Sequence, residues 1–259
     1  MKGISLCVVS ALALVGVASV QAAEMEKANI MRVYTDSVAP PDQQAYEAGA
    51  KSFNKCLAEH GFKYAWTTWL HETGDTYQYS YVSEPVNWAA FDAMHVQSSP
   101  CMAAWQSDVN PHLKGETSAF LEIKPELSYM AKDNMDAGSP LMEVTFFKLK
   151  QGHEASEAFT AAAKKIAAAA AKSNWSSHYT FVQVMDADHG APDFILSIYS
   201  KTWADFGKEP NQPLWKMVEG VYGKDSAAAM RKSVNGAIQE VWSHVDSRSA
   251  DLTYTPAGK

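Results

Sequence analysis

Ile30-Met31-Arg32-Val33 and Leu141-Met142-Glu143-Val144 are two versions of one short β-rich segment, and together they decide the fold. The following sequence repeats as well, since Asn87-Trp88-Ala89-Ala90-Phe91 is answered by Thr202-Trp203-Ala204-Asp205-Phe206. Each half closes with an acidic residue, leucine, a hydroxyl residue and tyrosine, at 126–129 and 251–254. Such a period is too long for a solenoid repeat. The sequence therefore predicts one ancestral domain that was duplicated and fused.

Each half predicts the same order of elements, βαββαβ, from hydrophobic periodicity and turn residues. In the first half we expect strands at 30–36, 63–71, 76–83 and 127–130, and helices at 43–60 and within 88–123. In the second half we expect strands at 141–149, 176–185, 193–200 and 252–254, and helices at 153–172 and within 202–245. This order is typical of a ferredoxin-like α+β domain, in which both helices cover one face of an antiparallel sheet.

The predicted strands carry apolar groups on both sides, as Val33 and Tyr34 do, so both faces of each sheet need cover. Two sheets packed face to face satisfy this need. Here the chain resembles the dimeric α+β barrel superfamily, which includes the antibiotic-biosynthesis monooxygenase, EthD and NIPSNAP-like families. The resemblance implies two tandem ferredoxin-like domains forming a pseudo-dimeric barrel, with a ligand often held between the sheets. It concerns the fold and implies no particular activity.

The first 22 residues predict a secretory signal peptide, because Lys2 precedes an apolar stretch that ends in small residues. A retained membrane anchor would need a longer apolar segment of about 20 residues. With cleavage after Ala22 or Ala23, we expect a periplasmic or extracellular protein that no longer contacts a membrane. The predicted division is a signal peptide at 1–22, a first domain at 23–130, a linker at 131–140 and a second domain at 141–259.

The charge balance argues against polyanionic partners. The chain has 22 basic and 29 acidic residues, a formal net charge of −7, and loss of Lys2 makes the mature chain more negative still. Binding to nucleic acid or anionic lipid needs clustered Lys and Arg. We therefore expect no nucleic-acid partner; a small-molecule ligand and a homo-oligomer remain open.

Two cysteines remain after cleavage, Cys56 and Cys101, and both lie in predicted helical segments of the first half. In an oxidising compartment they favour a disulfide over two buried thiols. It would close a loop of about 45 residues and stabilise the fold by about 4 kcal/mol in the chain-entropy model.

Candidate ligand contacts are the polar and aromatic side chains of the predicted strands. Arg32 and Glu143 occupy equivalent positions, where they could orient a polar ligand or pair with each other. His71 and His178 could each serve as a base, as a haem or metal ligand, or as a satisfied polar group. The full predicted set is Arg32, Tyr34, Trp69, His71, Gln78, Glu143, His178 and Tyr199.

No catalytic or cofactor motif accompanies the repeat. The chain has no nucleophile elbow, glycine-rich phosphate loop, H-E-x-x-H or C-x-x-C motif, and we predict no metal site and no resident cofactor. The leading hypothesis is an exported protein that binds a small apolar or aromatic molecule between its sheets. A cofactor-free monooxygenase-like or haem-linked oxidoreductase using Arg32, His71 or His178 is the enzymatic alternative, and a structural or interaction protein is the third.

Overall fold

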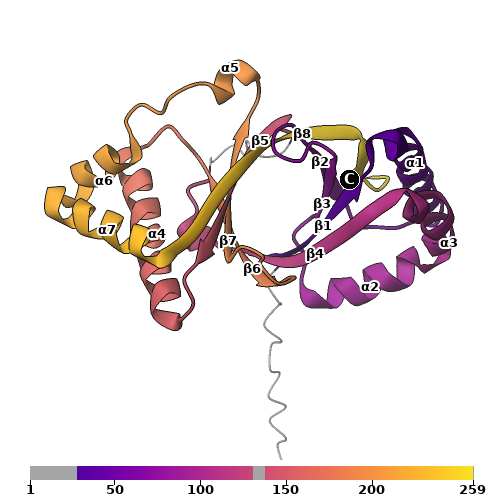
Figure 1. The fold of residues 1–259 in the computed structure, drawn as a ribbon, viewed down its shortest axis with the longest axis horizontal. Coiled ribbons are helices and arrows are strands. Elements are labelled where there is room, and N and C mark those ends of the chain that lie inside the picture. The colour runs from indigo at the N-terminus through magenta and orange to yellow at the C-terminus, as the bar shows by residue number, and fades with distance from the viewer. Residues whose placement is uncertain (1–27, 131–137, 259) are drawn as a thin grey trace, which may run out of the picture.

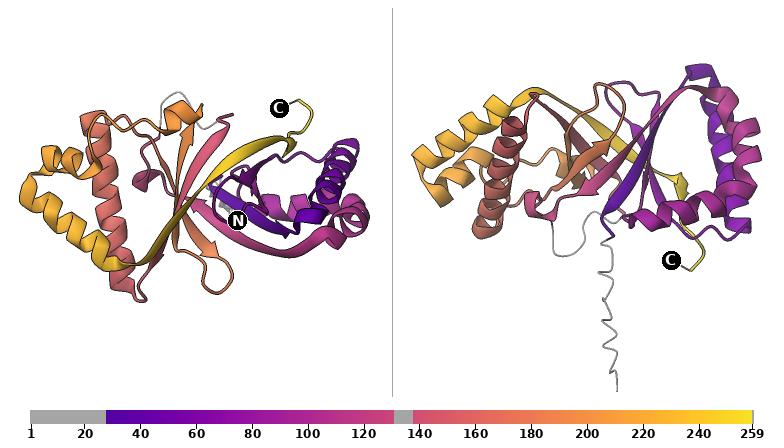
Figure 2. Two further views of the ribbon diagram at one scale, coloured as in Figure 1. Left: turned by 45° about the horizontal axis from the view of Figure 1, so that its top comes forward. Right: turned by 90° about the horizontal axis from the view of Figure 1, so that it is seen from below.

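The computed structural model describes residues 28–130 and 138–258. The predicted signal peptide lies outside these residues, as does most of the predicted linker. A closed barrel of eight strands forms the middle of the molecule, and one layer of helices covers it on each side (Figures 1 and 2). We refer to residues 30–130 as the first half and to residues 138–254 as the second half.

The two halves contribute equivalent sets of strands and helices. The first half contains β1 (Ile30–Val38), α1 (Gln43–Glu59), β2 (Trp66–His71), β3 (Gln78–Ser83), α2 (Trp88–Ser98), α3 (Met102–Ala104) and β4 (Leu113–Ile123). The second half contains β5 (Leu141–Leu149), α4 (His153–Ser173), β6 (Thr180–Asp186), β7 (Phe194–Ser200), α5 (Trp203–Phe206), α6 (Leu214–Tyr222), α7 (Lys224–Ala237) and β8 (Ile238–Tyr254). Among the described residues, no helix is both long and apolar enough to cross a membrane.

The strand order confirms the pseudo-dimeric α+β barrel. Around the barrel the order is β1-β3-β2-β8-β5-β7-β6-β4, and every pair is antiparallel. Each half thus supplies a ferredoxin-like four-stranded sheet. The sheets join where β2 pairs with β8 and where β6 pairs with β4.

Alternation along each strand separates a helix-facing side from a side that faces the barrel lumen. In β1, Val38 packs with Tyr46 of α1, whereas Thr35 faces the lumen and hydrogen-bonds to Ser80 of β3. In β5, Phe147 packs on Phe159 of α4. On the lumen side of β5, Met142 and Val144 form an apolar cluster with Trp69 of β2.

The last strand of each half is where the predicted elements were wrong. The segments expected to be helical up to 123 and 245 end earlier, because β4 begins at Leu113 and β8 begins at Ile238. Both strands gain ladders on two sides, which outweighs weak local helical preference. The strand expected at 127–130 is instead a 3-10 turn, Pro125–Leu127, followed by one bridge between Tyr129 and Tyr179.

The closing motif of each half packs into the hydrophobic core of the other half. Leu127 is fully buried in the core that lies under α4, α6 and α7 of the second half. Leu252 is buried in the first half with Tyr46 and Val109. Each half therefore completes the hydrophobic core of its neighbour.

The predicted disulfide is confirmed. Cys56 of α1 is bonded to Cys101, which follows α2, with 5.8 Å between their Cα atoms. Because Cys101 is fully buried, the bond ties the two helical segments together beneath the surface.

Candidate functional site

A cavity of about 400 Å³ lies between the sheet and the helices of the first half. Its walls are mainly aromatic and aliphatic, with contributions from Phe53, Leu57, Phe62, Phe91, Met94, Met102 and Trp105. Polar groups also line it, namely Arg32, Tyr34, Asn54, Trp66, Tyr81, Ser83, His95, Ser98 and Glu116. Its volume and its mixture of an apolar wall with a few polar groups are typical of small-molecule sites.

Arg32 is one of the residues that line this cavity, and its guanidinium is only partly hydrogen-bonded. Its guanidinium carbon lies 4.4 Å from the ring centroid of Tyr34 and 5.0 Å from that of Phe120. Nη2 is 3.5 Å from Ser118 Oγ, but the buried Nε has no hydrogen-bond partner among the described residues. A buried cationic donor without an acceptor is costly, so this position favours a ligand that supplies one.

A second buried donor lies two strands away on the same face. The backbone N–H of Arg32 donates to Ser83 Oγ at 2.8 Å, and Ser83 is paired with Trp66 in the β2–β3 ladder. The indole Nε1 of Trp66 is buried and, within the described chain, has no hydrogen-bond partner. Arg32 and Trp66 thus flank Ser83, and all three residues line the same cavity.

A chain of hydroxyl and carboxyl groups begins at Tyr81 in the cavity wall. Tyr81 Oη lies 2.7 Å from Tyr46 Oη, and Tyr46 donates to Asp36 Oδ2 at 2.6 Å. Asp36 is fully buried, and burial raises its pKa to about 7. The Tyr46 hydrogen bond acts against this rise, whereas the charge of Glu116, opposite Asp36 in the β1–β4 ladder, adds to it. A carboxyl group of this kind can accept or release a proton near neutral pH.

The corresponding space in the second half holds a large hydrophobic core. Its core joins Phe159, Phe181, Phe194, Met217 and Val218, with further apolar side chains around them. By the sequence repeat, Arg32 corresponds to Glu143 and Asp36 to Phe147, so the polar positions of the first half have diverged. This contrast indicates that the cavity of the first half is a specific feature and not a general property of the fold.

The structure separates the predicted site residues into three groups. Arg32, Tyr34 and Glu143 do not face the space between the sheets; they lie on the helix side of β1 and β5, so Arg32 and Glu143 are not brought together. Trp69, His71, Gln78 and Tyr199 lie on the lumen side, where Trp69 and Tyr199 are 6.0 Å apart between ring centroids. His178 stacks on Tyr129 at 4.7 Å.

The lumen contains a second, smaller cavity of about 270 Å³. Val33, Thr35, Leu121, Phe146 and Ile195 are among its lining residues. Two hydroxyl groups connect His71 to this space. His71 Nε2 is 3.1 Å from Ser80 Oγ, and Ser80 Oγ is 3.1 Å from Oγ1 of Thr35, which lines the cavity. Burial lowers the pKa of His71, with the charge of Asp246 acting in the opposite direction.

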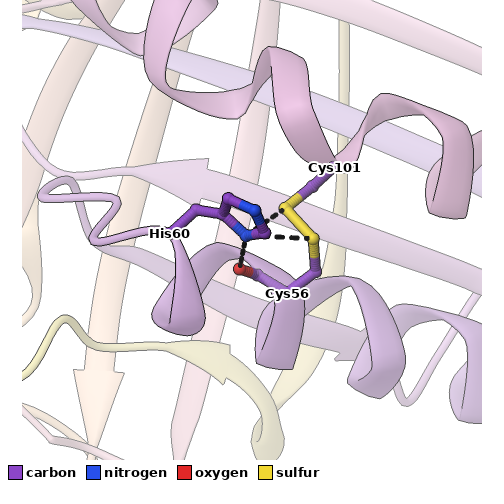
Figure 3. Close-up of side chains that lie close together, drawn as sticks. All are labelled: Cys56, His60 and Cys101. Atoms are coloured by element: carbon purple, nitrogen blue, oxygen red, sulfur yellow. Dashed lines mark hydrogen bonds between the residues drawn. A yellow bond between two sulfur atoms is a disulfide. The ribbon is translucent and has the colours of Figure 1, made fainter.

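His60, the residue that follows α1, lies against the disulfide (Figure 3). Its Nδ1 is 3.6 Å from Cys56 Sγ, 3.7 Å from Cys101 Sγ and 2.9 Å from the carbonyl oxygen of Cys56. With both sulfurs in a disulfide, neither is a thiolate that could ligate a metal or attack a substrate. The cluster is therefore structural in this state.

Sequence reasoning missed Asp36, Tyr46, His244 and Asp246. Asp36 follows Arg32 and Tyr34 at strand spacing, so the alternation that grouped the first two could have included it. His244 and Asp246 also have strand spacing, but the expected helix up to 245 concealed it. Tyr46 carries no such signal, because a tyrosine in an amphipathic helix is ordinary core.

Comparison with known proteins gives similarity in structure without similarity in sequence. No family model matches the chain, and no curated protein matches it. A candidate monooxygenase from Lactobacillus acidophilus NCFM superposes with a TM-score of 0.52 at 12% identity, over 88% of this chain and 97% of that one. An anthrone oxidase-like protein gives 0.53 at 10% identity, over 90% and 95%.

A mutant chlorite dismutase from Candidatus Nitrospira defluvii gives a TM-score of 0.50 at 12% identity, over 87% of this chain and 93% of that one. These proteins are all dimeric α+β barrel relatives. The fold is that of the dimeric α+β barrels. At such low identity the likeness concerns the fold alone, and the dimeric α+β barrel of this chain must be assigned a function from its own residues.

Proposed function

We propose that this dimeric α+β barrel binds a small aromatic molecule bearing an anionic oxygen in the cavity of the first half. The observation that carries the proposal is the pair of donors without a hydrogen-bond partner among the described residues, Arg32 Nε and Trp66 Nε1, on two residues of a mainly aromatic and aliphatic wall. The aromatic wall suits a flat apolar body, and the guanidinium suits a carboxylate or phenolate. The proposed ligand class follows the sequence hypothesis, but the proposed site lies under the helices and not between the sheets.

The predicted signal peptide and the disulfide support export of this binding protein, since disulfides persist in oxidising compartments. The ligand would then be a molecule met outside the cytoplasm. Transport, sensing and chemical conversion of that ligand are all compatible with binding alone.

A second candidate function is enzymatic, and one observation favours it. Asp36, whose pKa is raised to about 7, connects through Tyr46 to Tyr81 in the cavity wall. These hydrogen-bonded groups could take a proton from a phenolic or enolic ligand, which is the first requirement of cofactor-free oxygenation. The structural likeness to monooxygenase-like proteins is compatible with this reading.

The binding proposal is tested with 2-naphthoate and naphthalene, which share an aromatic body and differ in the carboxylate. We expect 2-naphthoate to bind more tightly, and Arg32→Gln to weaken 2-naphthoate by about 10- to 100-fold, the range for a charge-assisted hydrogen bond. Naphthalene affinity should change little. Isothermal titration calorimetry measures both ligands.

Arg231→Gln is the matched control, because Arg231 also lies over an aromatic ring, that of Trp215, but is exposed in the second half. It should leave both affinities unchanged. Equal affinity for the two ligands, or an equal loss in both arginine variants, would show that Arg32 does not recognise an anion. For the enzymatic candidate, oxygen uptake with an anthrone substrate should fall in Asp36→Asn while 2-naphthoate binding persists.

A further inference from the structure

Two histidines and one aspartate from the two halves of the chain meet in the barrel lumen. His71 is the last residue of β2 and lies opposite Asp246 in the β2–β8 ladder. His244 precedes Asp246 by two residues on β8, so both point to the same side of the strand. The imidazole rings of His71 and His244 lie 4.1 Å apart between centroids.

The nitrogens of both rings converge on one carboxylate oxygen. His244 Nε2 lies 3.2 Å from Asp246 Oδ1, and His71 Nε2 lies 3.9 Å from the same atom. The three ligand atoms all lie within 4.8 Å of one another. Two bonds of about 2.1 Å at a tetrahedral angle place ligand atoms about 3.4 Å apart, so only small side-chain movements separate this arrangement from a coordination shell.

One oxygen of the Asp246 carboxylate is buried without a hydrogen-bond partner among the described residues. Asp246 is 2% exposed, and Oδ1 makes no hydrogen bond within the described part of the chain. A buried carboxylate usually has hydrogen bonds or a cation beside it. Asp246 Oδ1 lies at ion-pair distance from both imidazoles but forms a hydrogen bond with neither. A cation bound by all three side chains would give this oxygen a partner.

We propose that His71, His244 and Asp246 form a binding site for a divalent first-row transition-metal ion. Two imidazoles and one carboxylate suit zinc, iron, nickel or copper better than calcium or magnesium. Ser80 lies beside His71, and Phe146 lies 5.0 Å from the His244 ring. Because Phe146 also lines the 270 Å³ lumen cavity, a coordination position on that side would face a space for water or a small ligand.

This site was absent from the sequence prediction because its members come from opposite halves and His244 was assigned to a helix. The proposal does not depend on the ligand cavity of the first half. A metal held here would connect β2 of one half to β8 of the other, next to the ladder that closes the barrel.

The test is a calorimetric titration of Zn²⁺ into tag-free, EDTA-treated protein whose disulfide is intact. We expect one zinc ion per chain, and at least 100-fold weaker binding in both His71→Gln and Asp246→Asn. His60→Gln is the matched control, because His60 belongs to the other histidine cluster of the chain. Its zinc binding should equal that of the wild type.

Circular dichroism establishes that the variants are folded. Nuclear magnetic resonance of the wild type gives an answer even if they are not, since zinc must shift the Nε2 resonances of both His71 and His244. No stoichiometric zinc binding by the wild type would overturn the proposal. Binding that depends on His60, or that leaves those two nitrogens unshifted, would overturn it as well.

Discussion

Arg32 and Asp36 show how a single strand can carry both recognition and proton chemistry. They lie four residues apart on the face of β1 that the helices cover. In the second half their equivalents are Glu143 and Phe147. Asp36 is kept in a buried position where a phenylalanine serves the other half. Burying the carboxyl group of Asp36 costs free energy of folding. Its presence is therefore explained more simply by proton exchange or ligand binding than by stability.

Asp36→Asn should remove one component of the pH dependence of stability. Because the pKa of Asp36 is raised to about 7 in the folded state, native Asp36 holds a proton that the unfolded chain releases above about pH 4. Its contribution to the free energy of unfolding is therefore fully present below about pH 4 and is lost as the pH rises to about 7. The slope is at most about 1.4 kcal/mol per pH unit.

Urea unfolding of both proteins across this pH range measures the effect. Asparagine can still accept the Tyr46 hydrogen bond, so the variant should remain folded. Asp251→Asn serves as a control, because Asp251 is exposed and forms a surface ion pair with Lys51. Parallel pH profiles for the wild type and Asp36→Asn would mean that Asp36 is ionised throughout.

At the scale of elements, α1 and α4 cover equivalent sheet faces with different packing. Ala50 of α1 is buried in a core cluster with Tyr46 and also lines the 400 Å³ cavity, whereas Ala163 of α4 is buried in the large core of the second half. Ala50→Leu should place its side chain in the cavity, abolish 2-naphthoate binding and leave stability equal or higher. Ala163→Leu should destabilise by about 1–3 kcal/mol through overpacking.

Thermal unfolding and the 2-naphthoate titration together check this pair. Ala50→Leu should abolish binding without lowering stability. Ala163→Leu should lower stability without affecting binding. A similar destabilisation by both substitutions would show that the cavity is closed in solution.

The disulfide joins α1 to the segment after α2 and is expected to contribute most of its stability through the unfolded chain. With a sequence separation of 45 residues, its removal in the Cys56→Ser, Cys101→Ser double variant should cost about 4 kcal/mol in the chain-entropy model. Chemical denaturation measures this cost. His60→Ala is the control, since it removes the adjacent imidazole and leaves the bond, and its effect should be small.

Particular elements show what could be predicted from the sequence. The repeat of β1 in β5 and the paired hairpins were sufficient to predict the order of elements in each half, because alternation and turn residues act locally. The barrel was predicted from the resemblance to the dimeric α+β barrel superfamily. The bounds of β4 and β8 were missed because each is stabilised by strands of the other half. Arg32 and Tyr34 were among the predicted site residues, but the side of the sheet that they face depends on which face the helices cover, and local pattern does not determine that.

At the scale of the whole molecule, the two halves depend on each other. The closing tyrosines Tyr129 and Tyr254 contact Tyr179 and Trp66 across the repeat. His71, His244 and Asp246 meet for the same reason. Sequence reasoning treats each half separately, so a site assembled across the barrel seam could not be predicted from either half.

Leu252→Ala tests this mutual dependence. Leu252 belongs to the second half in sequence but is buried in the core of the first half, and the reverse holds for Leu127. Each alanine substitution should lower the free energy of unfolding by about 2–5 kcal/mol, the range for a buried leucine. Val96→Ala is the control, because Val96 is 69% exposed and its loss should have little effect.

Hydrogen exchange measured along the chain distinguishes local from shared consequences. Since the β2–β8 and β4–β6 ladders make the barrel continuous, Leu252→Ala should reduce protection of the slowest amides in both sheets, and Leu127→Ala should do the same. If protection fell only in the first half for Leu252→Ala and only in the second for Leu127→Ala, the halves would be separate folding units. The crossed burial of the two leucines favours a single unit, because the core of each half is complete only when the closing segment of the other half is packed into it.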